Sequence, residues 1–529
     1  MTGASGHYLD NAATTPVDPA VVVRMRECLE AEQGCFANPS AIAHEAGRAA
    51  AAHVAVAREQ VARLIGADPA QIIFTSGATE ADNLAVLGTV RALAPGRRHI
   101  VSARTEHKAV LDAVRQLGRE GADVTWLAPD ADGRVSASAV AAVLRADTAL
   151  VSLMHVNNET GVIQDIHGIG AACRSRGVLF HVDAAQSAGR LALDLAQLPV
   201  DLLSLSAHKM HGPKGVGALF VRAGLRAPLM PLMFGGGQES GIRPGTLPTH
   251  QIAGFGLACE LAGDALQTDG ARIRQWCAQL WSRLEPLGGV TLNGESAPRV
   301  PHILNVSFDG VDGESLMNAL PGLAVSTGSA CNSALGEPSY VLRALGRSVR
   351  QAESALRFSF GRFTTAADIE AAATGVSRAV KRLRGISPAA TASPEAPTPL
   401  TLQPDALGPR TGELFARLEG SGVLDAGPGR VLQAEAGGPQ GEAWVRLHLR
   451  VHEDTVIEAR FQALGCPHTV ATASWLVKQL AGRSRATAQP GSPAEWAGTL
   501  GVPVEKLGRL LLIEDALHKV LQQWSHDWT

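Results

Sequence analysis

The stretch Asp201–Gly215 reads DLLSLSAHKMHGPKG. It joins an apolar run, typical of a buried strand, to the polar residues Ser206, His208 and Lys209 and then to a turn containing glycine and proline. Most lysines are solvated surface charges, but Lys209 directly follows a strand and is flanked by histidines. Such a lysine can lose its proton and act as an amine nucleophile. The stretch therefore predicts a Schiff-base lysine at a strand end.

A second apolar run lies upstream and ends in an acid. The segment HVDAAQS (181–187) places Asp183 at the end of a strand-like run. An acid on a neighbouring strand end can pair with the pyridinium nitrogen of pyridoxal phosphate (PLP), and that pairing makes the ring an electron sink. Lys209 and Asp183 together indicate a PLP site.

The composition is that of an ordinary globular protein. The 529 residues are 46% hydrophobic and 18% charged, with a net charge of -3, which gives no electrostatic case for nucleic acid or an anionic membrane as partner. The N-terminus lacks the basic start and apolar run of a secretory signal, and no stretch reaches the roughly 18 apolar residues of a membrane span. We expect a cytoplasmic protein. Its seven cysteines include no CxxC pair, so we expect reduced thiols and no metal site.

Strand-like and helical patterns alternate up to about residue 385, with an Ala-rich helix expected over 46–64. This alternation predicts an α/β fold with a mostly parallel sheet and functional groups at the carboxyl ends of its strands. We expect a large domain over about 15–255. A small α/β domain would combine the N-terminal segment with about 256–385, and a long helix would cover 253–284.

The rest of the chain divides into a linker and a further domain. Residues 386–410 are rich in proline and alanine, a composition typical of a semi-extended linker. The sequence pattern of residues 411–529 predicts a separate small α+β domain. The alternating segments AWVRLHLRV and TVIEARFQAL predict a hairpin, and helices are expected over 467–480 and 506–524.

Two loops carry further candidate residues. TSGATE (75–80) leads into a helix, where backbone amides and hydroxyls can cradle a phosphate. The same residues also fit an ordinary helix cap by Ser76 or Thr79, and the loop alone leaves both interpretations open. In GSACNSA (328–334), small polar neighbours predict a loop position for Cys331 rather than the buried, inert state usual for a free cysteine.

The first 385 residues resemble the NifS/IscS-type cysteine desulfurases, which are fold-type I PLP enzymes with an aminotransferase-like large and small domain. The resemblance is specific because many motifs occur in one order along nearly the whole segment. These motifs are YLDNAATTP, NPSAIAHEAGR, FTSGATEADN, TEHKAV, HVNNETGVIQDI, HVDAAQS, SAHKMHGPKG, GGGQESGIRPGTL, VSTGSACNSALGEPSYVLRALG and LRFSFGRFTT.

The resemblance implies a cofactor role for each matching residue. Lys209 would hold PLP through a Schiff base and later move the substrate Cα proton. Asp183 would pair with the pyridinium nitrogen and Gln186 with the phenolic oxygen, while His107 would stack on the ring. The other cofactor-binding residues, mainly at the phosphate, would be Ala78, Thr79, Ser206, His208, Asn158 and Thr246 of the partner subunit in a homodimer.

The resemblance also implies the substrate and sulfur chemistry. Asn158 and Arg357 would bind the carboxylate of L-cysteine, with Arg357 as a bidentate fork. Cys331 would be the nucleophile that takes the sulfur as a persulfide while L-alanine leaves. This chemistry needs a thiolate, and His107 would be the proton acceptor.

The C-terminal domain resembles the IscU/NifU-N type of iron–sulfur scaffold, through IEARFQALGCPHTVATASWLVKQLAGRS and LLIEDALHKVL. The family pattern has three cysteines and an Asp, but this domain has only Cys466. Gln440, Glu442 and the pair Gly508-Arg509 stand at the other positions. An iron–sulfur cluster is therefore not expected with the usual ligand set. Cys466 begins a helix whose amides stabilise a thiolate, so it could accept sulfur; a packed thiol in a docking domain is the alternative.

The leading hypothesis is thus a PLP-dependent cysteine desulfurase that donates sulfur to iron–sulfur cluster or other thio-cofactor assembly proteins. The fused domain would serve as acceptor or docking module. A selenocysteine lyase shares the fold and is one alternative, although the GSAC loop favours the sulfur reaction. An assembly platform with weak catalysis is the other, and the presence of Lys209, His107, Asp183, Arg357 and Cys331 argues against it.

Overall fold

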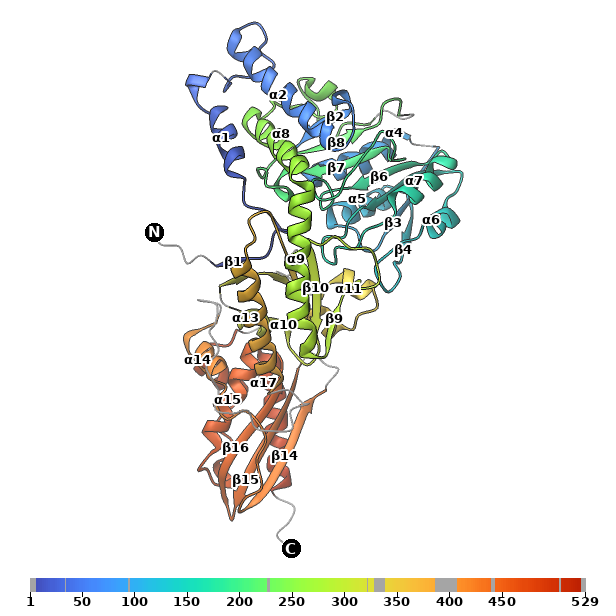
Figure 1. Ribbon diagram of the computed structural model, residues 1–529. Helices are drawn as coiled ribbons and strands as arrows, with labels where there is room; N and C mark the ends of the chain where they lie inside the picture. The colour runs from blue at the N-terminus through green and yellow to red at the C-terminus, as the bar shows by residue number, and fades with distance from the viewer. Residues whose placement is uncertain are drawn as a thin grey trace.

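Three domains follow one another along an elongated molecule in the computed structural model (Figure 1). The structure describes residues 6–33, 35–93, 96–225, 229–320, 322–327, 338–385, 407–438, 443–503 and 506–524. Cys331, Gln440, Glu442 and nearly all of the expected linker lie outside these ranges. Among the helices in the described ranges, none is long and apolar enough to cross a membrane.

A seven-stranded sheet forms the centre of the large domain, in the order β2-β8-β7-β6-β5-β3-β4. Strands β7, β6, β5, β3 and β4 run parallel, whereas β8 is antiparallel to both of its neighbours. The mostly parallel α/β sheet is confirmed. The strand bounds are β2 (Ile72–Thr75), β3 (His99–Ala103), β4 (Asp123–Leu127), β5 (Thr148–Met154), β6 (Leu179–Asp183), β7 (Leu202–Ser206) and β8 (Gly217–Val221).

Helices cover both faces of this sheet, so its central strands are buried and rich in Val, Ile and Leu. One face packs against α2 (Glu45–Leu64), α6 (Ala137–Val143), α7 (Ile166–Ser175) and α8 (Thr249–Asp264). The other packs against α3 (Ala78–Asn83), the π-helical turn η3 (Leu84–Gly88), α4 (Thr89–Leu93) and α5 (Lys108–Arg119). Helix α1 (Pro19–Glu27) lies against α8.

The small domain is built on the antiparallel sheet β12-β13-β10-β9, and the N-terminal strand β1 pairs with β11 beside it. Its strands are β1 (His7–Tyr8), β9 (Val290–Leu292), β10 (Ile303–Phe308), β11 (Leu323–Ala324), β12 (Ser326–Thr327) and β13 (Leu356–Ser359). Its helices are α9 (Leu266–Leu284), α10 (Gly313–Asn318), α11 (Tyr340–Ala344), α12 (Val349–Glu353) and α13 (Ala366–Arg384).

The expectation of one long helix over 253–284 is wrong, because two helices meet at Ala265. Helix α8 packs on α1 and α2 of the large domain, whereas α9 packs on α13 of the small domain. The chain therefore changes direction where its packing partners change, and the boundary expected near residue 255 falls inside α8.

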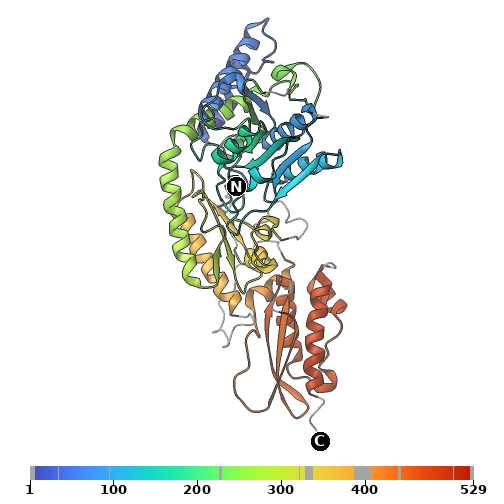
Figure 2. The same ribbon diagram turned by 90° about the vertical axis from the view of Figure 1, so that its right-hand side faces the viewer.

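The C-terminal domain has a three-stranded antiparallel sheet with helices beside it (Figure 2). The predicted hairpin is confirmed as β15 and β16, and both predicted helices are confirmed as α15 and α17. The bounds are α14 (Pro409–Arg417), β14 (Arg430–Gly437), β15 (Trp444–His452), β16 (Thr455–Leu464), α15 (Pro467–Leu480), α16 (Pro493–Leu500) and α17 (Leu507–Gln523). Short 3-10 turns occur at η1 (Ala31–Gln33), η2 (Pro69–Gln71), η4 (Ala207–Lys209), η5 (Gln238–Gly241), η6 (Glu285–Leu287) and η7 (Arg485–Thr487).

Candidate active site

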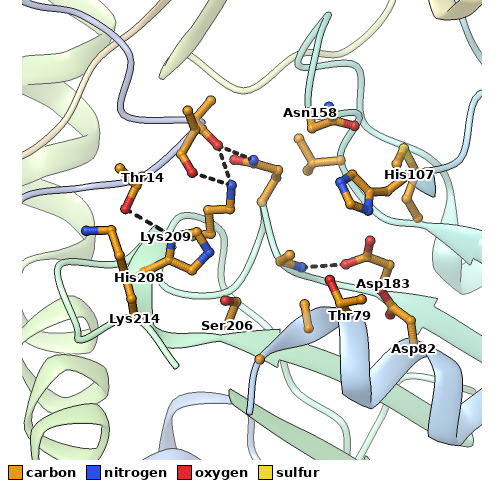
Figure 3. A pocket seen from close by; sticks show the side chains of 18 of the residues that line it. Thr14, Thr79, Asp82, His107, Asn158, Asp183, Ser206, His208, Lys209 and Lys214 are labelled. Atoms are coloured by element: carbon orange, nitrogen blue, oxygen red, sulfur yellow. Dashed lines mark hydrogen bonds between the residues drawn. The ribbon is translucent and has the colours of Figure 1, made fainter. Parts of the chain in front are cut away.

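Lys209 lies at the end of the turn η4, directly after the fully buried strand β7. The following turn is tight: a Cβ at Gly212 would lie 2.8 Å from the carbonyl oxygen of Ala207, so glycine is needed there. This turn directs Lys209 into a cavity of about 610 Å³. Its Nζ donates to the carbonyl oxygens of Ala12 and Ala13, at 2.6 and 2.8 Å. The amine is thus held at the centre of the cavity, as Figure 3 shows.

Asp183 and His107 line the same cavity opposite this lysine (Figure 3). Asp183 ends β6, is 6% exposed, and accepts a hydrogen bond of 2.9 Å from the Ala185 amide. Burial raises the pKa of Asp183, although His107, the Ala185 amide and Lys209 act to lower it. His107 caps α5, and its Nδ1 accepts from the Ala109 amide at 3.2 Å. A buried acid of this kind is satisfied when a cationic N–H of a bound ring pairs with it.

The start of α3 forms the other end of the cavity. Gly77 precedes the helix with φ 152°, and no described side chain caps it, so the alternative of capping by Ser76 or Thr79 is wrong. Strand β8 passes close behind: a Cβ at Gly217 would lie 2.7 Å from the Cα of Gly77. The uncapped amides and the hydroxyls of Thr79 and Ser206 at this end suit a phosphate group.

His208 lies between the cavity and the N-terminal segment. Its Nδ1 lies 3.0 Å from Oγ1 of Thr14. Burial, together with the positive charges of Lys209 and Lys214, lowers the pKa of His208 to about 4. The imidazole is therefore neutral near pH 7, so it can offer a hydrogen bond but no charge to a group bound in the cavity.

Arg357 brings the small domain into the site from β13. Its Nη1 donates to the carbonyl oxygen of Asn158 and its Nη2 to Oδ1 of Asp10, both at 2.9 Å. The side chain is nearly buried, yet its Nε has no hydrogen-bond partner among the described residues, and neither has Oδ1 of Asn158. The unpaired Nε–H of this guanidinium can donate to a bound carboxylate, whereas Oδ1 of Asn158 can accept from an N–H or O–H of a bound molecule.

The structure thus gathers most of the residues singled out in the sequence around one cavity. These are Ala78, Thr79, His107, Asn158, Asp183, Gln186, Ser206, His208, Lys209 and Arg357. Thr246 is exposed and is not among the described lining residues of its own chain.

Cys331 lies outside the described residues, but both described ends of its segment adjoin the cavity. On one side, Ser326 of β12 pairs with Arg357 in the small-domain sheet. On the other, the hydroxyl of Tyr340 donates to the carbonyl oxygen of Glu106, next to His107, at 2.7 Å. The described residues on either side of the Cys331 segment therefore contact Arg357 and Glu106, close to the cavity.

Sequence reasoning missed the contribution of the YLDNAATTP segment, which was recognised as a motif but given no role. Asp10 binds Arg357, the carbonyls of Ala12 and Ala13 accept from Lys209, and Thr14 contacts His208. Gln186 also donates to the Ala12 carbonyl, at 2.8 Å. Polar residues packed between small ones near the N-terminus were the available signal.

A buried acid–imidazole pair lies below Asp183. Asp82 is 1% exposed and adjoins Asp183 (Figure 3), and its Oδ1 lies 3.6 Å from Nε2 of the fully buried His181. Burial, reinforced by the charge of Asp183, raises the pKa of Asp82 well above its ordinary value, and burial lowers the pKa of His181 to about 3. Near neutral pH His181 is therefore neutral, and Asp82 keeps its proton to a higher pH than a free carboxyl group does.

Replacing Asp82 with asparagine is expected to make the free energy of unfolding depend more steeply on pH. From about pH 4 up to the raised pKa of Asp82, and no higher than about 6.5, an unfolded chain carries one proton on His181 and the folded chain one on Asp82, so the pair gives no net slope. In Asp82→Asn the unfolded state still binds a proton on His181, whereas the folded state binds none at this pair. Relative to the original chain, the free energy of unfolding should then rise by about 1.4 kcal/mol per pH unit.

Urea unfolding at several pH values in this window, followed through a large-domain probe, measures the slope. His181→Gln is the matched control, because it leaves only Asp82 and should give a slope of opposite sign. Parallel pH profiles for Asp82→Asn and the original chain would contradict the protonation states assigned here.

The lysine at a strand end, the buried acid beside it and the uncapped helix start fit PLP, which Lys209, Asp183 and the phosphate-end residues would hold. The fold and site define an α/β PLP-dependent enzyme of aminotransferase type. Residues 7–372 match the aminotransferase class-V family, and residues 416–527 match the NifU-like N terminal domain. The chain is 53% identical to the cysteine desulfurase IscS of Pectobacterium atrosepticum over 381 residues, covering 72% of this chain and 94% of that protein. It belongs to the cysteine desulfurase family.

Solved structures agree with this assignment. A NifS-like protein superposes with a TM-score of 0.66 at 33% identity, covering 71% of this chain and 100% of the other. A structure described as SspA in complex with cysteine gives a TM-score of 0.61 at 36% identity, covering 68% and 100%.

Proposed function

We propose that this enzyme converts L-cysteine to L-alanine, keeps the sulfur as a persulfide on Cys331, and donates it to iron–sulfur cluster or other thio-cofactor assembly. The observation that carries the proposal is the convergence of Lys209, Asp183 and Arg357, whose Nε has no partner among the described residues, on one cavity. Ser326, which precedes Cys331 by five residues, pairs with Arg357 in the small-domain sheet. The 53% identity to an enzyme named a cysteine desulfurase supports the same reaction.

Each residue has a task in this reaction. Arg357 and Asn158 bind the substrate carboxylate, and Lys209 Nζ takes the Cα proton. Bound PLP supplies the electron sink that makes this proton acidic. The Cys331 thiolate then attacks the substrate sulfur: an S–S bond forms, the C–S bond breaks, and its electron pair stays with carbon, which is protonated to give alanine. The balance is one L-cysteine and one thiol giving one L-alanine and one persulfide.

A selenocysteine lyase would release its chalcogen without a persulfide, so one experiment separates the two activities. The purified chain is given L-cysteine or L-selenocysteine, alanine is quantified, and peptides from a non-reducing digest are searched for added sulfur. We expect alanine from L-cysteine and a persulfide on the peptide with Cys331. Alanine from L-selenocysteine alone, with no sulfur on that peptide, would assign the lyase activity.

Replacing Arg357 with lysine is expected to raise KM for L-cysteine by about 10- to 100-fold with a smaller change in kcat. Lysine keeps the charge but loses the planar fork that binds both a carboxylate and the fixed partners Asp10 and Asn158. Steady-state kinetics measure the two parameters separately. An unchanged KM would refute the carboxylate-binding role.

The C-terminal domain is proposed to be a docking module rather than a cluster scaffold. It packs on α10 of the small domain: Oγ of Ser315 donates to the carbonyl oxygen of Gly465 at 2.8 Å, and Lys506 pairs with Glu314 at 2.9 Å. The hydrophobic core runs on from one domain to the other. The domain contains one cysteine, whereas a cluster held by thiolates needs several, which supports docking over cluster assembly.

Cys466 is buried at this contact and is only 3% exposed. Burial raises the pKa of its thiol and the nearby Glu314 adds to that effect, although a hydrogen bond to Thr469 acts in the opposite direction. The thiolate stabilisation expected from the start of α15 is therefore outweighed in the docked arrangement. Sulfur transfer to Cys466 would require the domain to leave α10, and the digest described above reports it directly as added sulfur on the Cys466 peptide.

A homodimer is proposed on two observations. Thr246 is exposed rather than directed into its own cavity, and apolar side chains nearby in sequence are exposed as well: Phe234 by 86% and Met233 by 44%. Large exposed apolar side chains of this kind favour a protein partner. Sedimentation equilibrium of the purified chain measures the mass, and a monomer at micromolar concentration would contradict the proposal.

A further inference from the structure

A cluster of two thiols and an imidazole lies away from the active-site cavity, among helices of the large domain. Cys28 ends α1, Cys35 follows the turn η1, and His53 lies on α2. One ligand atom from each residue lies within 4.8 Å of the corresponding atoms of the other two. Cys28 and Cys35 are 2% and 1% exposed and pack against Ala253 of α8, whereas His53 is half-buried.

We propose that Cys28, Cys35 and His53 form a binding site for a thiophilic divalent cation, with Zn²⁺ as the expected ion. Tetrahedral zinc binds sulfur at about 2.3 Å and imidazole nitrogen at about 2.0 Å, which places its ligand atoms about 3.3–3.8 Å apart. The separations here exceed that range by about 1 Å at most, which side-chain rotation can close. The half-exposed side of His53 leaves the fourth position to water.

The charges around the cluster suit a neutral complex. Two thiolates balance the charge of a divalent ion, so the assembled site adds no net charge to the interior. The groups that face it, Arg24 and Glu27, form an ion pair of 3.0 Å with each other.

The third ligand distinguishes this cluster from a simple thiol pair. Two thiols at this distance could also be oxidised to a disulfide, but a disulfide would not involve the imidazole that lies beside them. Without an ion, the Cys35 thiol donates to the carbonyl oxygen of Glu27 at 3.1 Å. A bound ion would replace this contact and tie the end of α1 to the segment after η1 and to α2.

Metal uptake has a defined proton balance that can be measured. Thiols bind the ion as thiolates, so metal uptake releases protons and the apparent affinity should rise with pH. Competition with a chromophoric zinc chelator, using the full-length PLP-loaded protein under reducing conditions, measures stoichiometry and affinity. Co²⁺ is the spectroscopic probe, because thiolate ligands give it an intense charge-transfer band.

Substitutions of the proposed ligands test whether the ion binds at this cluster. Cys28→Ser with Cys35→Ser is expected to lose one equivalent of Zn²⁺ and the Co²⁺ band while retaining alanine formation from L-cysteine. Cys173→Ser, which alters another buried cysteine of the same domain, should keep both. Should the double variant fail to fold, His53→Ala still tests the site, with an expected loss of at least about 10-fold in affinity.

Two results would overturn the proposal. One is an equal zinc stoichiometry in the original chain and the double variant. The other is a Cys28–Cys35 disulfide, detected by mass spectrometry in protein purified without reductant, together with no Co²⁺ band after reduction. The chemistry at Cys331 does not enter either readout, so a failure here leaves the proposed desulfurase activity untouched.

Discussion

Replacing Lys209 with alanine should reduce alanine formation from L-cysteine by at least about 10³-fold. The amine is the only described lysine nitrogen held by two carbonyl oxygens at the centre of the cavity, at 2.6 and 2.8 Å from Ala12 and Ala13. Without it the cofactor has no covalent attachment and the substrate Cα proton has no acceptor. The phosphate end, built from Thr79, Ser206 and the start of α3, stays intact.

Binding and covalent attachment can therefore be separated in this variant. We expect Lys209→Ala to retain PLP after brief gel filtration but to lose the absorption band of the lysine-bound cofactor and the mass of PLP after borohydride reduction. Lys214→Ala is the matched control, because Lys214 also lines the cavity but is exposed at its edge. Borohydride-fixed PLP in Lys209→Ala, or its loss in Lys214→Ala, would move the assignment to Lys214.

Replacing Cys331 with serine should lower turnover of L-cysteine by at least about 10³-fold while leaving PLP and L-cysteine binding unchanged. A hydroxyl is of similar size but is a far weaker nucleophile toward sulfur, because the reactive form is a thiolate. The described ends of the Cys331 segment pair with β13 and hydrogen-bond to Glu106, and neither contact involves the substituted atom. The variant should therefore bind L-cysteine and stop before sulfur transfer.

Spectral titration with L-cysteine measures binding in Cys331→Ser, and alanine analysis measures turnover. Cys277→Ser is the matched control: Cys277 is half-exposed on α9, and burial raises the pKa of its thiol to about 11, so it should be inert. Full alanine formation by Cys331→Ser would show that the thiol is dispensable, as in a lyase. Loss of activity in Cys277→Ser would contradict the assignment and indicate that Cys277 carries the reactive thiol.

Much of the site could be predicted because its residues follow strands. Asp183 ends β6 and Lys209 ends the turn that follows the neighbouring parallel strand β7, and parallel strands bring their carboxyl ends to one edge of the sheet. The local sequence patterns alone therefore predicted that the segments of Asp183 and Lys209 meet at one site. The resemblance to a known family supplied the other cofactor residues, which local pattern could not assign, since Thr79 and Ser76 fitted a helix cap equally well.

The sequence by itself determined the elements whose signals are local. The alternation in β15 and β16, the helix after Cys466, and the strand that ends at Ser206 follow from side-chain periodicity and turn residues. The break between the two helices at Ala265 could not be predicted from the sequence pattern. It occurs where α8 and α9 pack against different parts of the protein.

Only the tertiary structure decided the long-range contacts. Arg357 meets Asp10 across 347 residues of sequence, and Cys466 is covered by a helix of another domain. The thiols of Cys28 and Cys35 meet His53 because α1, the segment after η1 and α2 pack together. Periodicity records which face of an element is buried, but not which surface buries it, so these partners were fixed only when the whole chain was packed.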